Sequence, residues 1–245
     1  MTFGGSLLFF DVLQRVAYRF GRAPQEWVAG ILQRWLIQVW KVAGTTLQVE
    51  RDERILPGEP YLIVANHQSM FDIPIFGALL FSNRPKYISK RELAKGIPSI
   101  SYNLRVGGHA LIDRDDRAGA TRAIRELAAQ VKERGVSAVI YPEGTRARRG
   151  ALGKFRPAGA LALFDEAPDV PIVTVTIDES WRLLQFNLFP VRFGTRVRVR
   201  IGAPVARKPD EDRRVLLADA RHEIESTLAR WRGTPPPEEK ERVVA

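Results

Sequence analysis

From residue 45 onward the chain alternates short apolar runs with amphipathic segments, and this alternation restricts its fold more than any other feature. The apolar runs have the length of buried strands, at Tyr61–Ala65, Lys86–Ser89, His109–Ile112, Val136–Tyr141 and Pro171–Ile177. Helical spacing of apolar residues predicts helices at Ile73–Phe81, Ala118–Arg134, Pro157–Glu166 and Asp212–Trp231. Such alternation favours an α/β domain over residues 45–232, with a largely parallel or mixed sheet flanked by helices.

Two further segments complete this outline. Residues Arg192–Ile201 alternate basic with apolar residues, which predicts a late strand at the edge of the sheet. Residues 233–245 contain three consecutive Pro and then mostly charged residues, a composition typical of a disordered tail.

Residues 1–44 have the pattern of a helical hairpin. Helices are expected at Ser6–Phe20 and Gln25–Val42, and the second has a wide apolar face that carries Trp27, Trp35 and Trp40. Basic residues lie in the same region, as in helices that rest in a membrane interface. The hairpin lacks the run of about 18 apolar residues that a spanning helix needs. The alternative is a hairpin packed on its own domain, with the Trp side chains in the core.

Charge and composition limit the possible partners. The formal net charge of +10 suits nucleic acid, an anionic membrane surface or a polyanionic substrate. The absence of Cys excludes disulfides, a thiolate nucleophile and a Cys-based metal site, and it agrees with a reducing compartment. Three scattered His residues give no metal site, so no metal and no cofactor are expected. Asp11 interrupts the first apolar run, so a cleaved signal peptide is not expected.

The segment Asn66-His67-Gln68-Ser69-Met70-Phe71-Asp72 contains a candidate general base. Imidazole titrates near neutral pH, and a carboxylate on its far nitrogen would fix the tautomer and stabilise the imidazolium. Asp72 is placed for that role across a turn. Two structural alternatives exist for Asp72: a helix N-cap before Ile73-Pro74, and one half of a Ser69–Asp72 capping box.

The segment Tyr141-Pro142-Glu143-Gly144-Thr145-Arg146 has the residues of an anion-binding loop. Backbone amides freed by Gly144, the Thr145 hydroxyl and the Arg146 guanidinium would form a phosphate cradle, with Glu143 orienting Arg146 or a substrate hydroxyl. Arg114 is a candidate for a second phosphate contact, and Lys154 for a secondary one. The alternatives are a solvated basic turn for the loop and a surface salt bridge for Arg114.

Three of these candidates, His67, Arg114 and Glu143, lie just beyond the ends of predicted strands. Open α/β sheets bind ligands beyond the carboxyl ends of their strands, so we expect His67, Arg114 and Glu143 to converge on one cleft. His109 and His222 are expected to be structural and surface residues, respectively. The sequence has no Gly-x-Ser-x-Gly, no Gly-x-Gly-x-x-Gly and no Gly-Lys-Ser/Thr loop, which disfavours serine hydrolases, dinucleotide oxidoreductases and standard nucleoside triphosphatases.

These residues resemble the four sequence blocks of the glycerolipid acyltransferases, and most of all the bacterial 1-acylglycerol-3-phosphate acyltransferases. The resemblance covers roughly residues 45–205, and its blocks occur in the family's order: Asn66-His67-x4-Asp72, Gly108-x-x-Leu111-Ile112-x-Arg114, Glu143-Gly144-Thr145-Arg146 and Val170-Pro171-Ile172. The chain departs from common family patterns at Leu111, at Arg156-Pro157-Ala158-Gly159 and at Thr174.

The resemblance implies an enzyme that transfers a fatty acyl group from acyl-CoA or acyl carrier protein to the sn-2 hydroxyl of lysophosphatidic acid. His67 and Asp72 would be catalytic, and Glu143, Gly144, Thr145, Arg146 and Arg114 would hold the acceptor's phosphate. The segment Lys90-Arg91-Glu92-Leu93 resembles a basic segment of the family, which implies a secondary phosphate role for Lys90. The N-terminal hairpin would attach the protein to the membrane bilayer, at the cytoplasmic face of the cell membrane, as a peripheral or monotopic protein.

Two alternatives stay open at this point. In the first, the enzyme is an acyltransferase with a different acceptor: glycerol 3-phosphate, another lysophospholipid or a lyso-aminolipid. In a non-enzymatic alternative, the protein is a basic membrane scaffold or binds nucleic acid through Arg192–Arg200. Nucleic acid is not expected, because the aromatic residues cluster at the N-terminus and do not interleave with that strand.

Overall fold

Seven strands form one sheet in the computed structural model, which describes residues 3–42, 44–113, 115–147, 149–184, 192–208 and 211–237. The strand order is β1-β7-β6-β2-β5-β3-β4, and every neighbouring pair is parallel except β6 with β7. The strands are β1 (Thr46–Arg51), β2 (Leu62–Ala65), β3 (Pro85–Lys90), β4 (Ala110–Ile112), β5 (Ser137–Ile140), β6 (Ile172–Asp178) and β7 (Arg196–Ile201). The predicted α/β fold with a largely parallel, mixed sheet is confirmed.

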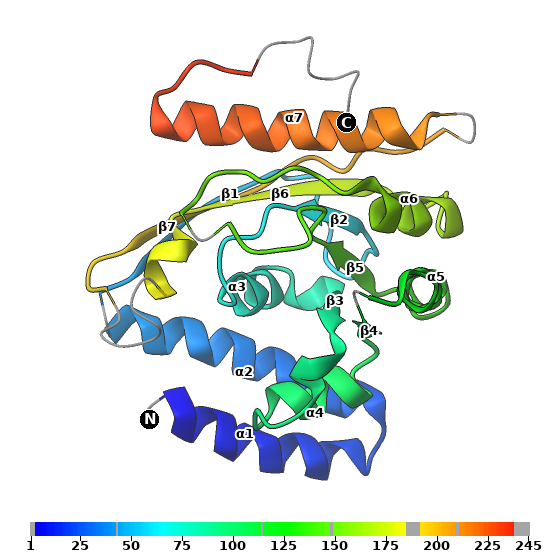
Figure 1. The fold of residues 1–245 in the computed structure, drawn as a ribbon. Coiled ribbons are helices and arrows are strands. Elements are labelled where there is room, and N and C mark those ends of the chain that lie inside the picture. Colours follow the sequence, from blue (N-terminus) through cyan, green and yellow to red (C-terminus); the bar gives the residue numbers. More distant parts are fainter. Residues whose placement is uncertain are drawn as a thin grey trace.

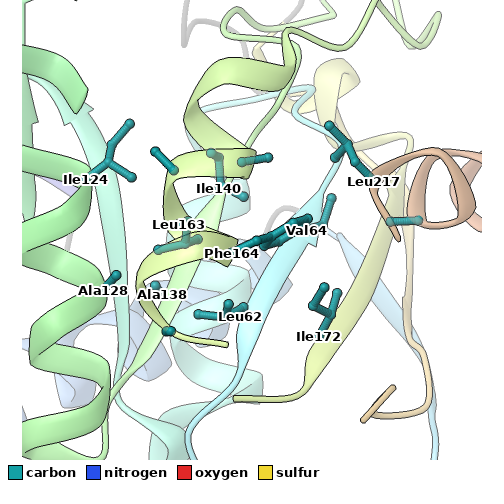
Figure 2. Packing of buried hydrophobic residues seen from close by; sticks show 14 of the residues in the cluster. Leu62, Val64, Ile124, Ala128, Ala138, Ile140, Leu163, Phe164, Ile172 and Leu217 are labelled. Carbon is teal, nitrogen blue, oxygen red and sulfur yellow. The ribbon is translucent and has the colours of Figure 1, made fainter. Parts of the chain in front are cut away.

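The period-2 alternation of strand side chains divides the core into two halves. Helices cover both faces of the sheet (Figure 1). Leu62 and Val64 of β2 pack with α5 (Arg117–Arg134), α6 (Pro157–Glu166) and α7 (Arg213–Arg232), as Figure 2 shows for part of this cluster. Ile63 and Ala65 point to the other face, against α1 (Phe3–Tyr18), α2 (Arg22–Val42) and α3 (Asp72–Leu79). Because helices cover both faces, β2, β5 and β6 are buried along their whole length and consist mostly of apolar residues, which made them recognisable in the sequence.

The shorter elements were harder to predict. Sequence patterning missed β1 and the helix α4 (Ile100–Val106), as well as the 3-10 helices η1 (Phe81–Asn83), η2 (Arg91–Ala94) and η3 (Ser180–Leu184). Strand β1 is largely exposed, so it has no apolar run. Its presence corrects the expectation for β7, which lies between β1 and β6 and is not an edge strand. Alternate residues of β7 are buried, while Arg198 and Arg200 bond to Trp231 and Glu223 of the covering helix α7.

The two predicted N-terminal helices are present, and they pack on the α/β domain. Helix α2 lies between α1 and α3, and it buries Leu32, Leu36 and Trp40 in the same core half as the sheet residues (Figure 1). The Trp40 ring meets Phe71 edge-on at 4.4 Å between centroids. The expected interface role of Trp40 is therefore wrong, because its side chain lies in the core. The predicted disordered tail falls mostly outside the described residues, which end at residue 237.

A buried ion cluster joins α2 to β3 and α5. Glu26 Oε1 lies 3.0 Å from Lys86 Nζ and 2.6 Å from Arg134 Nη2. The Glu26 and Lys86 side chains are each 5% exposed. Burial lowers the pKa of Lys86 to about 8, although the neighbouring Glu26 carboxylate favours the charged form. Keeping this ammonium ionised at neutral pH therefore costs folding free energy.

This cost makes stability depend on pH. Between the folded pKa near 8 and the ordinary value of 10.5, the unfolded chain binds more protons than the folded one. The free energy of unfolding should therefore rise as pH increases, by roughly 1–2 kcal/mol between about pH 8 and 9.5. Urea unfolding measures it, and Lys86→Met should abolish the rise. Lys132→Met, an exposed substitution on α5, should keep it. A flat profile in the unmodified protein would contradict this assignment.

Candidate active site

The loop after β2 brings an imidazole and a carboxylate together. His67 Nδ1 lies 2.7 Å from Asp72 Oδ2, and the two side chains are 17% and 0% exposed. A carboxylate only accepts hydrogen bonds, so in the neutral ring Nδ1 carries the proton. Nε2 then keeps its lone pair for accepting a proton from a substrate. The predicted His67–Asp72 pairing is confirmed.

Backbone amides also hold the Asp72 carboxylate in place. Oδ2 accepts the N–H groups of Gln68 at 2.7 Å and Ser69 at 2.9 Å. The contact with Ser69 is one half of the capping box considered above. The N-cap alternative is wrong, because α3 begins at Asp72, its N-cap is Phe71, and no side chain caps it. The turn therefore fixes the carboxylate that in turn orients the imidazole.

The second motif reaches the first through the backbone of His67. Glu143 Oε1 accepts the His67 N–H at 2.7 Å, and the Ala147 N–H donates to the His67 carbonyl oxygen at 2.7 Å. Strand β5, which precedes the motif, lies beside β2 with Ile140 opposite Val64. The predicted convergence of His67 with the residue 143–147 loop is thus confirmed.

Glu143 has a different role from the one expected. Its second oxygen, Oε2, accepts the Gly153 N–H at 2.7 Å, so backbone amides occupy both carboxylate oxygens. Among the ion pairs of the described residues, none joins Glu143 to Arg146. Burial raises the pKa of the Glu143 carboxyl, while the two amide bonds favour its ionised form. The expected pairing of Glu143 with Arg146 is therefore wrong, and its contact with a substrate hydroxyl or phosphate stays a prediction. Glu143 links the loops on either side of it.

Gly144 turns the loop outward. Its φ of +66° is in the left-handed region that favours glycine, and its N–H donates to the Tyr141 carbonyl at 3.0 Å. Thr145 and Arg146 follow on the exposed side of the turn. Arg156 is also exposed, and its side chain passes 3.5 Å from the position that a Cβ at Gly144 would take. The loop thus presents a hydroxyl and two guanidinium groups beside the His67 loop.

The remaining predicted site residues are less tightly placed. Arg114 lies outside the described residues. Lys90, at the carboxyl end of β3, is 3.9 Å from Glu92 and partly exposed, and Lys154 is exposed in the residue 150–156 loop. Trp27 and Trp35 of α2 are 60% and 40% exposed. His109 is half-buried and accepts the Tyr87 N–H, which agrees with the structural role expected of it.

Sequence reasoning missed an aromatic partner of the base. The Tyr141 ring stacks on His67, with centroids 4.1 Å apart and an interplanar angle of 21°. Its hydroxyl is buried and has no hydrogen-bond partner among the described residues. The parallel pairing of β2 with β5 carries the signal for this contact, because Val64 lies opposite Ile140 and Tyr141 therefore lies beside the start of the loop that carries His67. Tyr141 restricts the imidazole on one face.

A cavity of about 240 Å³ lies apart from these residues, between α2, η1 and the start of β3. It is lined in part by Gly30, Phe81 and Lys86, and neither His67 nor the residue 143–147 loop contributes to it. The partly exposed His67 side chain therefore lies outside this cavity, at the carboxyl ends of β2 and β5.

Comparison with known proteins agrees with this geometry. The family model described as Acyltransferase matches residues 46–178. The chain is 32% identical over 145 residues to the human 1-acyl-sn-glycerol-3-phosphate acyltransferase alpha, covering 58% of this chain and 50% of that protein. It is 25% identical over 172 residues to the Haemophilus influenzae 1-acyl-sn-glycerol-3-phosphate acyltransferase, covering 69% of each. It thus spans about half the length of the human relative and more of the bacterial one.

A solved structure is similar over most of the chain. The crystal structure of the 1-acyl-sn-glycerophosphate (LPA) acyltransferase PlsC from Thermotoga maritima matches with a TM-score of 0.66 and 25% sequence identity. The match covers 94% of this chain and 90% of that one, so it includes the N-terminal helices as well as the sheet.

The stacked ring generates a prediction about Tyr141. Tyr141→Phe keeps the stack and removes a buried hydroxyl without a partner, so stability should stay constant or rise by up to about 1 kcal/mol. Turnover should then stay within about threefold of the unmodified protein, whereas Tyr141→Ala should lower it by roughly tenfold or more. Steady-state kinetics and thermal unfolding measure both. A large loss of turnover in Tyr141→Phe would show that the hydroxyl itself takes part in the reaction.

Proposed function

This chain belongs to the acyltransferase family, and we propose that it acylates the sn-2 hydroxyl of 1-acylglycerol 3-phosphate to give phosphatidic acid. The acyl donor would be a thioester, acyl-CoA or acyl carrier protein. The observation that carries the proposal is the His67–Asp72 pair, whose loop is bonded to the Arg-containing loop at residues 143–147. The names of the human, Haemophilus and Thermotoga relatives support this acceptor.

In the proposed reaction His67 is the general base. Nε2 takes the proton of the acceptor hydroxyl while the hydroxyl oxygen attacks the thioester carbonyl carbon. Asp72 stabilises the imidazolium through Nδ1–H. The carbon–sulfur bond then breaks, and the thiolate leaves with the electron pair and takes the proton back from the imidazolium. No acyl-enzyme is required, because a thiolate is a good leaving group and this chain has no Cys nucleophile.

The acceptor phosphate would bind at the loop that follows β5. The Thr145 hydroxyl and the Arg146 guanidinium supply donors, and guanidinium groups bind phosphate through paired hydrogen bonds. Gly144, whose N–H already bonds to the Tyr141 carbonyl, contributes the turn that directs these two side chains outward. Arg114 belongs to the same proposal as a second guanidinium, with Lys90 and Lys154 as secondary contacts. Holding the phosphate here would leave the neighbouring hydroxyl free to approach Nε2.

The nucleic-acid alternative loses support from the arrangement of β7. Arg198 Nη1 donates to the Trp231 carbonyl at 2.7 Å, and Arg200 Nη1 lies 2.8 Å from Glu223 Oε1. These guanidinium groups hold α7 on the sheet, so they do not form a free basic strand. Retention on DNA is therefore expected to be weak.

We propose membrane association through the outer face of α1. This helix is the outermost layer below the sheet in Figure 1. Along it, six large apolar or aromatic side chains are exposed to solvent: Leu8, Phe9, Val12, Leu13, Val16 and Tyr18. Phe20, just beyond the helix, is exposed as well. The Trp35 indole N–H bonds to Ser6 at 2.9 Å, which places a partly exposed aromatic ring beside this face. The protein would bind as a peripheral or monotopic protein at the cytoplasmic face of the cell membrane.

The described helices give no candidate for a membrane span, because none of them is both long and apolar enough to cross a bilayer.

Replacing the base tests the mechanism. His67→Ala should lower turnover by at least about 10²-fold, because general-base catalysis contributes on that scale. The assay measures acyl transfer from defined thioesters to 1-acylglycerol 3-phosphate, glycerol 3-phosphate, other lysophospholipids and a lyso-aminolipid. Turnover near that of the unmodified protein would rule out the mechanism. A preference for acceptors without phosphate would refute the phosphate site and leave the base intact.

Replacing the α1 face tests the membrane proposal. The triple substitution Leu8→Ser, Val12→Ser, Val16→Ser should weaken binding to anionic vesicles by roughly tenfold or more, because each exposed side chain loses apolar area that the interface would bury. Vesicle co-sedimentation measures the effect. The control replaces exposed apolar residues elsewhere, Leu56→Ser and Val215→Ser. Equal binding by all three proteins would count against the α1 face.

A further inference from the structure

The segment Ile177–Ser180, at the end of β6, packs against the loop that carries His67. The Asn66 side-chain amide exchanges two hydrogen bonds with the Ile177 backbone, both at 2.8 Å. The next polar side chain of the loop, Gln68, donates to Asp178 Oδ1 at 3.1 Å. The His67 loop and the end of β6 therefore contact each other residue after residue, although about 110 residues separate them in the chain.

The last of these contacts reaches the Asp72 carboxylate. The Ser180 hydroxyl donates to Asp72 Oδ1 at 2.6 Å, and both residues are fully buried. Oδ2 is the oxygen that meets His67 Nδ1 and the Gln68 and Ser69 amides. Among the hydrogen bonds of the described residues, Ser180 supplies the one to Oδ1. A short O–H bond to a carboxylate is among the stronger hydrogen bonds in proteins.

The backbone just before Ser180 is held in a sparsely populated conformation. Glu179 has a φ of +68°, which is uncommon for a residue with a side chain and costs free energy that the surroundings must offset. The Glu179 N–H donates to Asp178 Oδ1 at 3.0 Å, and Arg232 of α7 pairs with the Asp178 carboxylate. This turn ends β6 and starts η3 with the Ser180 hydroxyl directed at Asp72.

We infer that Ser180 is a positioning residue for acyl transfer, acting through Asp72, an inference that rests on the proposed function. A carboxylate bonded at one oxygen alone can rotate about its Cβ–Cγ bond. Bonding Oδ1 to Ser180 fixes that rotation, so Oδ2 stays aligned with Nδ1 of His67. The imidazole then keeps Nε2 directed outward in the tautomer that the reaction needs.

Kinetics of Ser180→Ala test the inference. Removing the hydroxyl should lower kcat by about tenfold, as expected for losing a hydrogen bond to a charged group, while KM stays unchanged because Ser180 does not touch substrate. Ser180→Thr keeps a hydroxyl and should recover most of the lost turnover. Ser101→Ala is the matched control, since Ser101 is also buried and its hydroxyl donates to the Leu93 carbonyl, away from the site. It should keep the turnover of the unmodified protein.

A second measurement separates positioning from loss of folding. In an Asp72→Asn background, followed with a radiolabelled donor, Ser180→Ala should lower the residual rate by less than about twofold, because groups that act as a unit are not additive. A tenfold loss that persists there, an equal loss in Ser101→Ala, or a Ser180→Ala protein within about twofold of unmodified kcat would each overturn the inference. Every comparison uses the acceptor that the unmodified protein prefers. If the proposed acceptor is wrong, the unmodified protein itself will prefer another acceptor. If the role of Ser180 is wrong, the ratio of kcat between Ser180→Ala and the unmodified protein will differ from the expected one.

Discussion

The site depends on how the backbone of a single residue, His67, is held. Its N–H donates to Glu143 and its carbonyl accepts from Ala147, so two loops separated by more than 70 residues meet at one residue. Parallel pairing of β2 with β5 makes this meeting possible, because it delivers both chain segments to the same edge of the sheet. Glu143 serves this junction as a buried acceptor of two amides, and the exposed guanidinium groups lie beyond it.

The polar groups around the base form successive layers. Asp72 contacts the imidazole, two backbone amides and Ser180 contact Asp72, and the turn at Glu179 directs Ser180. Tyr141 closes one ring face. Each layer removes a rotation that the previous layer leaves free, which is how a solvent-accessible histidine can keep one orientation without a metal ligand or a covalent link. The N-terminal helices add the outer layer: α2 completes the core, and α1 exposes an apolar face next to it.

Much of this arrangement could be predicted from the sequence, for identifiable reasons. Buried parallel strands and amphipathic helices carry strong patterns, and the His67–Asp72 pair depends on local spacing, so both were recovered. Strand β1 was missed because it is exposed and has few apolar residues, and β7 was misplaced at the edge for that reason. Trp40 was misassigned because an apolar helix face looks the same whether a bilayer or a domain covers it. The pairing of Glu143 with Arg146 was wrong because the observed partners of Glu143 are backbone amides, which leave no trace in the sequence. Ser180 went unnoticed because its contact depends on tertiary structure alone.

In the proposed function, the His67 imidazole and the cationic loop after β5 contact the same acceptor molecule. A crystal structure with 1-acylglycerol 3-phosphate bound and no acyl donor present would test it most directly. The sn-2 hydroxyl oxygen is expected within about 3.2 Å of His67 Nε2, with the phosphate in contact with Arg146. A phosphate bound away from the residue 143–147 loop, or an imidazole whose Nε2 faces the protein interior, would contradict it.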